Sequence, residues 1–316
     1  MNAKRFLAAC GLALAVLGLT ACSREPSAVQ APQAQTPQAQ APQAQTPQAQ
    51  TPQAAQTEYI RAVPEAYFAP AAQAGQVVEI SYGSRDYTDA SEPAIQKTAY
   101  VYLPYGYDEA DLETRYDVLY LMHGWTMTAG GFLDTAQSFS RSVEELSVFH
   151  RDLRENLIPF VESRYHTYAQ DVTEAGLRAS RAHRAFGGFS LGAVTTWYQF
   201  LYNLDCIRYF FPMSGDCWIM GTYGGLNHPV ETVDRLEQAV SDGGWSRDDF
   251  SISQGIGTQD LIWDQTDSQI QEMLGRELFD AEPLHYAILE GGRHDLDACA
   301  RYLYHALQRF FGGDAS

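Results

Sequence analysis

Ser190 lies at the centre of the sequence pattern that points most directly to chemistry. Residues 187–192 spell Gly-Gly-Phe-Ser-Leu-Gly and contain the pattern G-x-S-x-G, between an expected strand and an expected helix. At such a turn the serine takes a strained backbone conformation that lifts its hydroxyl above the sheet edge, and the flanking glycines avoid clashes. The pattern therefore predicts that Ser190 is the nucleophile of an acyl-transfer reaction.

A serine nucleophile needs a histidine base, which in this arrangement follows the serine and the acid along the chain. His294 lies in the segment Gly-Gly-Arg-His-Asp at 291–295, directly after an expected strand at 284–289. This position places His294 in a loop at the carboxyl edge of a parallel sheet, where ligands bind. The other histidines after Ser190 lie in a loop before a proline, in a strand and in the last helix: His228, His285 and His305. We expect His294 to be the base.

The acid that orients the base should follow the preceding strand. There the chain has Gly-Thr-Gln-Asp at 257–260, which favours Asp260. In so acidic a chain an aspartate can occur in this loop by chance, and Asp264 and Asp267 remain alternatives.

Two backbone N–H groups would have to stabilise the oxyanion of the tetrahedral intermediate. The amide of Leu191, directly after the nucleophile, is one expected donor. The loop after an expected strand at 117–122 begins His-Gly-Trp, and Gly124 would let its backbone come close. We expect the Trp125 amide to be the second donor and His123, which precedes the nucleophile, to shape the loop.

These residues need a framework of strands alternating with helices. Strands are expected at 76–82, 98–103, 117–122, 184–189, 207–213, 250–255 and 284–289. Apolar periodicity predicts helices around 153–161, 194–202, 230–241, 266–278 and 296–311. The alternation predicts an α/β fold, with a mostly parallel sheet covered by helices on both faces and an antiparallel lead-in from the first two strands.

Taken together, these motifs resemble carbohydrate esterase family one, an α/β-hydrolase family that holds feruloyl and acetylxylan esterases and is related to esterase D. The resemblance covers about residues 76–312 and includes Met-Ser-Gly-Asp-Cys-Trp at 213–218. It implies that the loop after the strand at 207–213 shapes the substrate cleft. Asp216, Trp218 and Trp125 are therefore expected to bind substrate.

The resemblance implies a serine ester hydrolase that removes feruloyl or acetyl groups from plant cell-wall polysaccharide such as arabinoxylan. The chain departs from the family pattern at Trp-Thr-Met-Thr, residues 125–128, and at Arg293, which interrupts Gly-Gly-His-Asp. These departures leave two alternatives open. One alternative is an esterase for small molecules, such as a siderophore or thioester hydrolase. The other is a surface-tethered binding protein without activity.

The first 57 residues predict an export signal and a tether. Residues 1–22 have a short basic start, an apolar core too short to span a bilayer and the ending Leu-Thr-Ala-Cys, which resembles a lipoprotein signal with Cys22 as the lipidated residue. Residues 23–57 include the decapeptide APQAQTPQAQ twice in succession and predict an extended, solvated linker. The esterase domain is then expected at 58–316, held at the cell envelope through the lipid alone, at the outer membrane or cell surface.

The composition of the chain limits the classes of partner that we expect it to bind. The formal net charge of −18 disfavours nucleic acid and anionic lipid surfaces, and a neutral ester substrate fits best. No spacing of ligand residues predicts a metal, no cofactor is expected, and a monomer is expected. Three cysteines remain in the domain: Cys206, Cys217 and Cys299. A strand between Cys206 and Cys217 excludes their pairing, while a Cys217–Cys299 disulfide stays open.

Overall fold

The structure is a computed structural model that describes residues 57–60, 62–125, 127–128, 131–132, 139–280 and 282–311. These residues belong to one of the two units into which the chain divides. The predicted signal, Cys22 and nearly all of the predicted linker lie outside the described residues.

The strands are β1 Thr57–Tyr59, β2 Gln76–Arg85, β3 Ala94–Leu103, β4 Val118–Met122, β5 Met127–Thr128, β6 Gly131–Phe132, β7 Arg184–Phe189, β8 Tyr209–Met213, β9 Ser251–Gly257 and β10 Leu284–Leu289. The α-helices are α1 Phe139–Asp152, α2 Ile158–Glu162, α3 Glu174–Ala179, α4 Leu191–Tyr202, α5 Gly224–Asn227, α6 Pro229–Asp242, α7 Trp263–Leu274 and α8 Leu296–Leu307. A π-helix, η5 Leu153–Leu157, joins α1 to α2, and short 3-10 helices lie at η4 Glu65–Tyr67, η6 Arg181–His183, η7 Arg247–Asp249 and η8 Glu277–Phe279.

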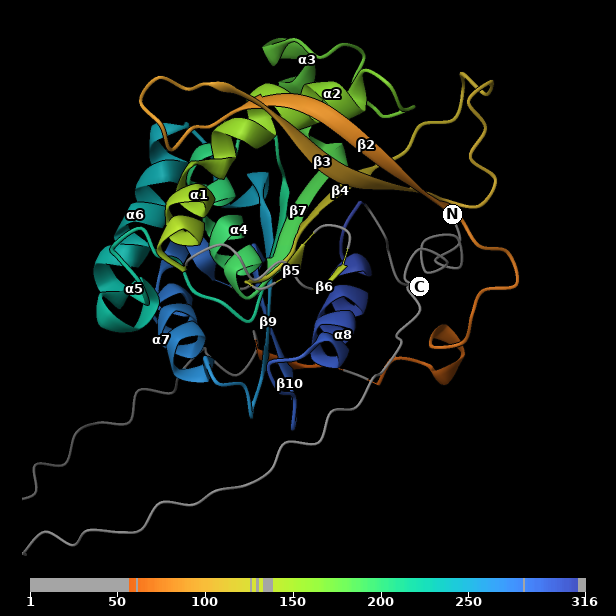
Figure 1. Cartoon of the computed structure of the whole chain (residues 1–316). Coiled ribbons are helices and arrows are strands. Elements are labelled where there is room, and N and C mark those ends of the chain that lie inside the picture. Colours follow the sequence, from red (N-terminus) through yellow and green to blue (C-terminus); the bar gives the residue numbers. More distant parts are fainter. Residues whose placement is uncertain are drawn as a thin grey trace, which may run out of the picture. The chain divides into compact units, whose positions relative to one another are not determined.

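The central sheet has six strands in the order β1-β10-β9-β8-β7-β4, and every neighbouring pair is parallel (Figure 1). The carboxyl ends of these strands therefore share one edge, from which the loops after β4, β7, β8, β9 and β10 leave. The predicted bounds of β7 and β10 are confirmed. The mostly parallel α/β architecture is confirmed as well.

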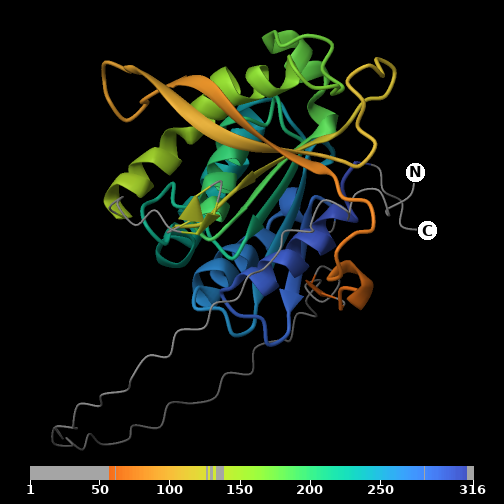
Figure 2. The same ribbon diagram turned by 45° about the vertical axis from the view of Figure 1, so that its right-hand side comes forward.

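The expected antiparallel lead-in is the hairpin β2–β3, whose ten-residue strands form a sheet of their own. Figure 2 shows the hairpin crossing beside α1 and α2. Three groups of the hairpin contact the fully buried carboxylate of Asp152: the Tyr82 hydroxyl at 3.0 Å, the Ser84 hydroxyl at 2.5 Å and the Lys97 ammonium at 2.8 Å. These bonds fasten the hairpin to the end of α1.

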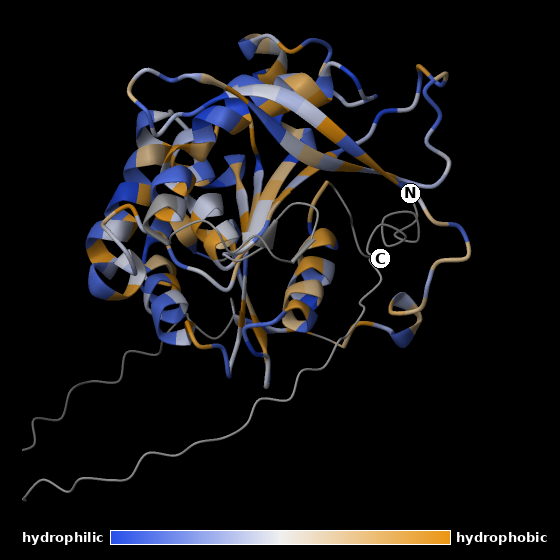
Figure 3. Ribbon diagram, viewed as in Figure 1, coloured by the Kyte–Doolittle hydropathy of each residue, from blue (hydrophilic) through white to orange (hydrophobic). Residues whose placement is uncertain are grey.

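Alternate residues of the sheet strands feed two separate cores. On one face Ala185, Phe189, Phe211 and Met213 pack against α8. On the other, Phe186 and Phe210 join the larger core beneath α4 and α6. Helix α8, for example, carries both hydrophilic and hydrophobic residues, as a helix with one buried face does (Figure 3). The sheet is thus covered on both faces, as predicted.

The helices differ from their predicted ranges mainly at the ends. Helix α8 begins after Asp295, whose side chain accepts a hydrogen bond from the Ala298 N–H, and it ends at Leu307 rather than at 311. Helix α7 begins three residues earlier than predicted and ends four residues earlier. The apolar stripe at 153–161 covers the π-helix and most of α2, and α1 before it was not predicted.

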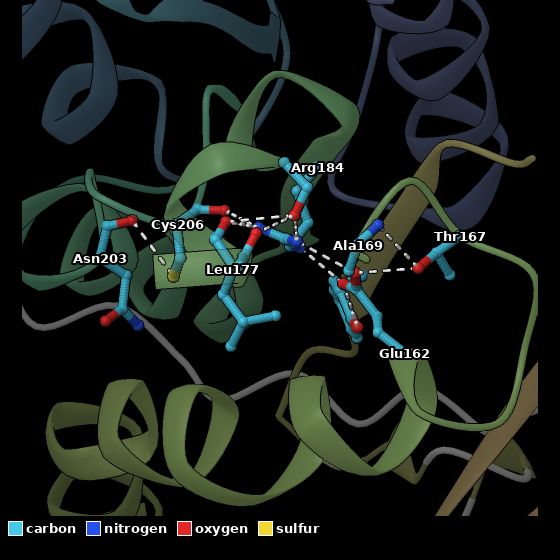
Figure 4. Close-up of polar contacts among 10 residues, drawn as sticks. Glu162, Thr167, Ala169, Leu177, Arg184, Asn203 and Cys206 are labelled. Carbon is cyan, nitrogen blue, oxygen red and sulfur yellow. Dashed lines mark hydrogen bonds and ion pairs between the residues drawn. The ribbon is translucent and has the colours of Figure 1, made fainter. Parts of the chain in front are cut away.

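A buried ion pair holds the amino end of β7 (Figure 4). The Arg184 guanidinium donates to both carboxylate oxygens of Glu162, at 2.6 and 3.0 Å, and to the Ser180 hydroxyl at 2.6 Å. It also donates to the carbonyls of Leu177 and Cys206. These bonds use all five guanidinium N–H groups, which is what a buried arginine needs to offset its desolvation.

The edge strand β1 starts at Thr57, the last residue of the predicted linker, and pairs with β10 in parallel. Its Glu58 forms an ion pair with Arg309 and lies 3.5 Å from the imidazole of His305. Within the described part of the chain, none of the helices combines the length and apolar character that crossing a membrane would need.

Candidate active site

Ser190 occupies the strained turn that the sequence pattern predicts. It lies between β7 and α4 with φ 60° and ψ −118°, a backbone conformation that non-glycine residues rarely adopt. Two neighbours hold the turn: the Ser190 N–H donates to the Met213 carbonyl at 2.9 Å, and the Ser190 carbonyl accepts from the Ala193 N–H at 2.8 Å. The strain is therefore maintained by β8 on one side and by the first turn of α4 on the other.

The glycines around Ser190 are required by close backbone contacts. A Cβ on Gly188 would lie 2.5 Å from the Gly192 carbonyl oxygen, and a Cβ on Gly192 would lie 2.4 Å from the Met122 carbonyl oxygen. Both distances are shorter than real Cβ atoms tolerate. These contacts also bring the end of β4 against the start of α4.

The structure brings His294 and Asp260 together. Nδ1 of His294 lies 2.9 Å from Oδ1 and 3.1 Å from Oδ2 of Asp260. The Asp260 side chain is fully buried, while that of His294 is 18% exposed. With Nδ1 directed to the carboxylate, Nε2 is the nitrogen left to exchange a proton with a substrate or nucleophile.

The His294 ring lies beside the nucleophile turn. Its centroid is 4.6 Å from that of Phe189, the residue directly before Ser190. This contact was not predicted, although Phe189 stands inside the G-x-S-x-G pattern. It places the acid–base pair and the serine at the same stretch of the carboxyl edge.

The two alternative acids lie elsewhere. The Asp267 carboxylate accepts from the Tyr286 hydroxyl at 2.9 Å and from the Gln271 amide at 3.1 Å. Asp264 is exposed in the first turn of α7. Of the three aspartates considered, Asp260 is the one that the structure pairs with His294.

One of the two predicted oxyanion donors has a clear structural basis. The Leu191 N–H is at the first position of α4, where a helical N–H has no acceptor within the helix, and the helix dipole favours negative charge there. Trp125 is 48% exposed. Directly before it, the His123 imidazole contacts the Gly124 carbonyl at 2.9 Å and so braces the start of the loop. The Trp125 amide stays a predicted donor, because part of this loop lies outside the described residues.

Asp216 and Trp218 are buried against each other. The Trp218 indole N–H donates to Asp216 at 2.9 Å, the Gly225 N–H donates to the other carboxylate oxygen at 2.9 Å, and burial raises the pKa of Asp216. Their exposed fractions are 2% for Asp216 and 6% for Trp218. In this structure the pair holds the loop after β8, and the substrate-binding role expected for it stays a prediction.

The remaining histidines lie outside this arrangement. His285 is within β10, where burial, followed by the nearby Arg309 charge, lowers its pKa to about 4. His305 is inside α8 beside Glu58, and His228 precedes α6. These placements agree with the reasons for preferring His294.

The three cysteines of the domain are free thiols, so the Cys217–Cys299 disulfide left open by the sequence is not formed. Cys217 is fully buried, and burial raises its pKa to about 12. Among the described residues, no group of three or more His, Cys, Asp or Glu side chains has the arrangement of a metal site.

Comparisons with known proteins agree with this geometry. No family model matches the chain. Endo-1,4-beta-xylanase Y of Acetivibrio thermocellus is 32% identical over 281 residues, covering 79% of this chain and 24% of the xylanase. The chain thus spans about a quarter of the length of that relative.

Two solved structures match this chain over more than nine-tenths of their own length. A mutant of the feruloyl esterase module from Clostridium thermocellum, complexed with sinapinate, is 29% identical with a TM-score of 0.68, covering 83% of this chain and 96% of the module. This chain has the α/β-hydrolase fold and resembles carbohydrate esterase family one. A CE1 ferulic acid esterase from Anaeromyces mucronatus shares the fold of this chain at 20% identity, with a TM-score of 0.57, covering 76% of this chain and 91% of the other.

Proposed function

We propose that this protein is a serine esterase that removes hydroxycinnamoyl groups, chiefly feruloyl, or acetyl groups from plant cell-wall polysaccharide such as arabinoxylan. The observation that carries the proposal is the pairing of His294 with Asp260 beside the strained Ser190 turn. The similarity to a feruloyl esterase module complexed with sinapinate, which is itself a hydroxycinnamate, supports the choice of acyl group. The similarity to a xylanase supports a xylan-type polymer.

In the proposed mechanism, Ser190 Oγ attacks the ester carbonyl carbon while His294 Nε2 takes the hydroxyl proton. Asp260 keeps the imidazole in the tautomer with a proton on Nδ1 and stabilises the imidazolium that forms. When the tetrahedral intermediate collapses, the carbon–oxygen bond to the sugar breaks and the imidazolium returns its proton to the leaving alcohol. Water then attacks the acyl-serine by the same sequence, releasing the acid.

The developing oxyanion would be stabilised by the Leu191 amide, with Trp125 as the second proposed donor. The Leu191 N–H is preorganised because α4 fixes it, so no reorganisation accompanies the reaction. Removal of one such donor in other acyl-transfer enzymes costs about 10²–10³ in kcat. The Trp125 ring is exposed, and we propose that it contacts the acyl group or the sugar.

The direct test is hydrolysis of methyl ferulate, p-nitrophenyl acetate and acetylated xylan by the purified protein, with Ser190→Ala as the control. Turnover of ferulate that is lost in Ser190→Ala would support the feruloyl assignment. Turnover of acetyl esters alone would retain the mechanism and reject that assignment. If the protein neither turns over these esters nor reacts with a serine-directed phosphonate, the enzyme proposal is overturned in favour of a tethered binding protein.

We also propose that the esterase is exported and anchored to the cell envelope through lipid on Cys22. Support comes from the residues Leu-Thr-Ala-Cys at 19–22 and from the repeat of Ala, Pro, Gln and Thr at 31–50. A tether of this composition would let a membrane-bound domain reach a bulky polymer. The test is metabolic labelling with a fatty acid in the native host, which we expect Cys22→Ser to abolish.

A further inference from the structure

The loops that carry Asp260 and His294 are hydrogen-bonded to each other through residues that precede Asp260 and His294 in the chain. The Thr258 N–H donates to the Leu289 carbonyl at 3.0 Å, and the Gln259 N–H donates to the Gly292 carbonyl at 2.9 Å. A Cβ on Gly257 would lie 2.2 Å from the Gly292 carbonyl oxygen, so the two backbones are in direct contact.

Side chains add further bonds between the same loops. The Thr258 hydroxyl accepts from the Gly291 N–H at 2.8 Å and lies 3.4 Å from a carboxylate oxygen of Glu290. The Arg293 Nε–H donates to the Gln259 side-chain carbonyl at 3.2 Å. Gly291 has φ 69°, a conformation in which glycine is favoured, so Thr258 bonds the turn at its left-handed residue.

These contacts advance in step along both loops toward the acid–base pair. Thr258 contacts Gly291, Gln259 contacts Arg293, and Asp260 contacts His294. Arg293 and Gln259 are the residues directly before the base and the acid. Arg293, which interrupts the family pattern Gly-Gly-His-Asp, is therefore bound to the loop of the acid.

We propose that Thr258, Gln259 and Arg293 form a latch that positions His294 against Asp260 for the ester hydrolysis proposed above. The base loop contains two consecutive glycines, Gly291 and Gly292, and would otherwise sample many conformations. The latch limits that freedom in the free enzyme, so less ordering is needed in the transition state. These three are positioning residues, since they act through the acid–base pair.

A competing role for Arg293 would be recognition of an anionic group on the substrate. The neighbouring sequence disfavours it, because Glu290 and Asp295 lie within three residues of Arg293 and carry charges that would repel an anion. Gln259 is a neutral partner with a side-chain carbonyl suited to a guanidinium N–H. The bond between them fits a geometric role better than ion pairing with a ligand.

The test compares Arg293→Met and Thr258→Val, which remove the donor and the hydroxyl while retaining most of the side-chain volume. With p-nitrophenyl acetate we expect kcat to fall about threefold to tenfold in each, the range for loss of one hydrogen bond, with KM within twofold. Gln259→Glu keeps an acceptor for Arg293, so its kcat should be higher than that of Gln259→Met. Combining Arg293→Met with Gln259→Met should cost no more than Arg293→Met alone, because both remove the same bond.

Arg301→Met is the matched control. Arg301 is a surface arginine of α8 paired with Asp297, and its loss should leave kcat unchanged. A second readout needs no ester: the low-field proton resonance of the His294 Nδ1–H should broaden in Arg293→Met and stay sharp in Arg301→Met.

Unchanged kcat and an unchanged Nδ1–H resonance in Arg293→Met would overturn the latch. A rise in KM confined to carboxylate-bearing esters would also overturn it, in favour of substrate recognition by Arg293. Failure of the feruloyl assignment would appear differently, as absence of methyl ferulate turnover in the wild type. In that case p-nitrophenyl acetate kinetics and the proton resonance still decide the role of the latch.

Discussion

The two ends of β7 are built on opposite physical principles. At the amino end, Arg184 is buried with every guanidinium N–H bonded, five donors to Glu162, Ser180 and two carbonyls. At the carboxyl end, six residues later, Ser190 is held at φ 60° between glycines that permit no Cβ. One end satisfies all of its polar groups, whereas the other stores strain that presents a hydroxyl.

The difference shows how the strand serves stability and chemistry at once. Because removing one partner of a buried ion pair leaves an uncompensated charge, substitutions at the amino end are expected to lower the free energy of unfolding more than substitutions at the carboxyl end. Because strained residues persist only when their surroundings hold them, the carboxyl end depends on that stability. Changes at the carboxyl edge should therefore affect rates, and changes at the amino edge should affect folding.

The largest expected effect is on catalysis, from Asp260→Asn. This change keeps the shape of the side chain but no longer favours the proton on His294 Nδ1, so kcat/KM should fall about 10³–10⁴-fold. Steady-state kinetics and thermal unfolding would be measured on the same samples. The matched control is Asp267→Asn, whose carboxylate bonds Tyr286 instead, and it should retain kcat within about threefold. Equal losses in both variants would argue against Asp260 as the acid.

At the other end of β7, Arg184→Met should lower the free energy of unfolding by about 3–5 kcal/mol, because Glu162 would remain buried without its cation. Urea denaturation gives this value. Adding Glu162→Gln should restore part of the stability, since the unpaired charge is then absent. A loss below about 1 kcal/mol in Arg184→Met would mean that the ion pair does not dominate this region.

His285 gives a smaller, pH-dependent effect. Its pKa is lowered to about 4 by burial and by Arg309, with Glu58 and His305 nearby, whereas an unfolded histidine titrates near 6.5. Between these values the unfolded chain binds more protons, so the free energy of unfolding should decrease as pH falls from about 6.5 to 4, by at most about 3 kcal/mol.

Thermal unfolding of the wild type and His285→Gln across this pH range would measure the effect. The variant should lose stability less steeply on acidification. His228→Gln, at an exposed histidine, should follow the wild-type curve and serves as the control. Parallel curves for His285→Gln and the wild type would contradict the assignment.

The smallest effect is expected at a surface ion-pair network. Arg276 contacts the carboxylates of Asp234, Glu237 and Glu272 at 3.0, 3.2 and 2.7 Å, in a partly exposed setting. Solvent screens such pairs, so Arg276→Gln should cost about 0–1 kcal/mol in urea denaturation and leave kcat unchanged. A cost as large as that of Arg184→Met would remove the distinction between buried and exposed pairs.

Much of the framework could be predicted because it is encoded locally. Strands β7 and β10 are apolar runs bounded by turn residues, and both were found with their predicted bounds. Strand β9 extends two residues beyond its prediction, through Gly257, because pairing with β10 continues to Leu289. Strand β1 was missed because its three residues become a strand only by pairing with β10, far away in the chain.

The site was predictable to the extent that chain order and loop position define it. Ser190, His294 and Asp260 each follow a strand of the same parallel sheet, so the sequence places them at one edge. Burial of Asp216 and Trp218 was not predictable, because it depends on Gly225 folding back over the loop after β8. The partner of Arg293 was equally hidden, since it lies 34 residues away in the loop of the acid.

The most direct test of the central claim is covalent labelling with a fluorophosphonate, followed by peptide mass spectrometry. We predict that one equivalent reacts and that the modified residue is Ser190, with no labelling of Ser190→Ala. We further predict that Asp260→Asn is labelled more slowly, because the acid helps His294 to activate the hydroxyl. Labelling at another serine, or ester hydrolysis that persists in Ser190→Ala, would contradict the account.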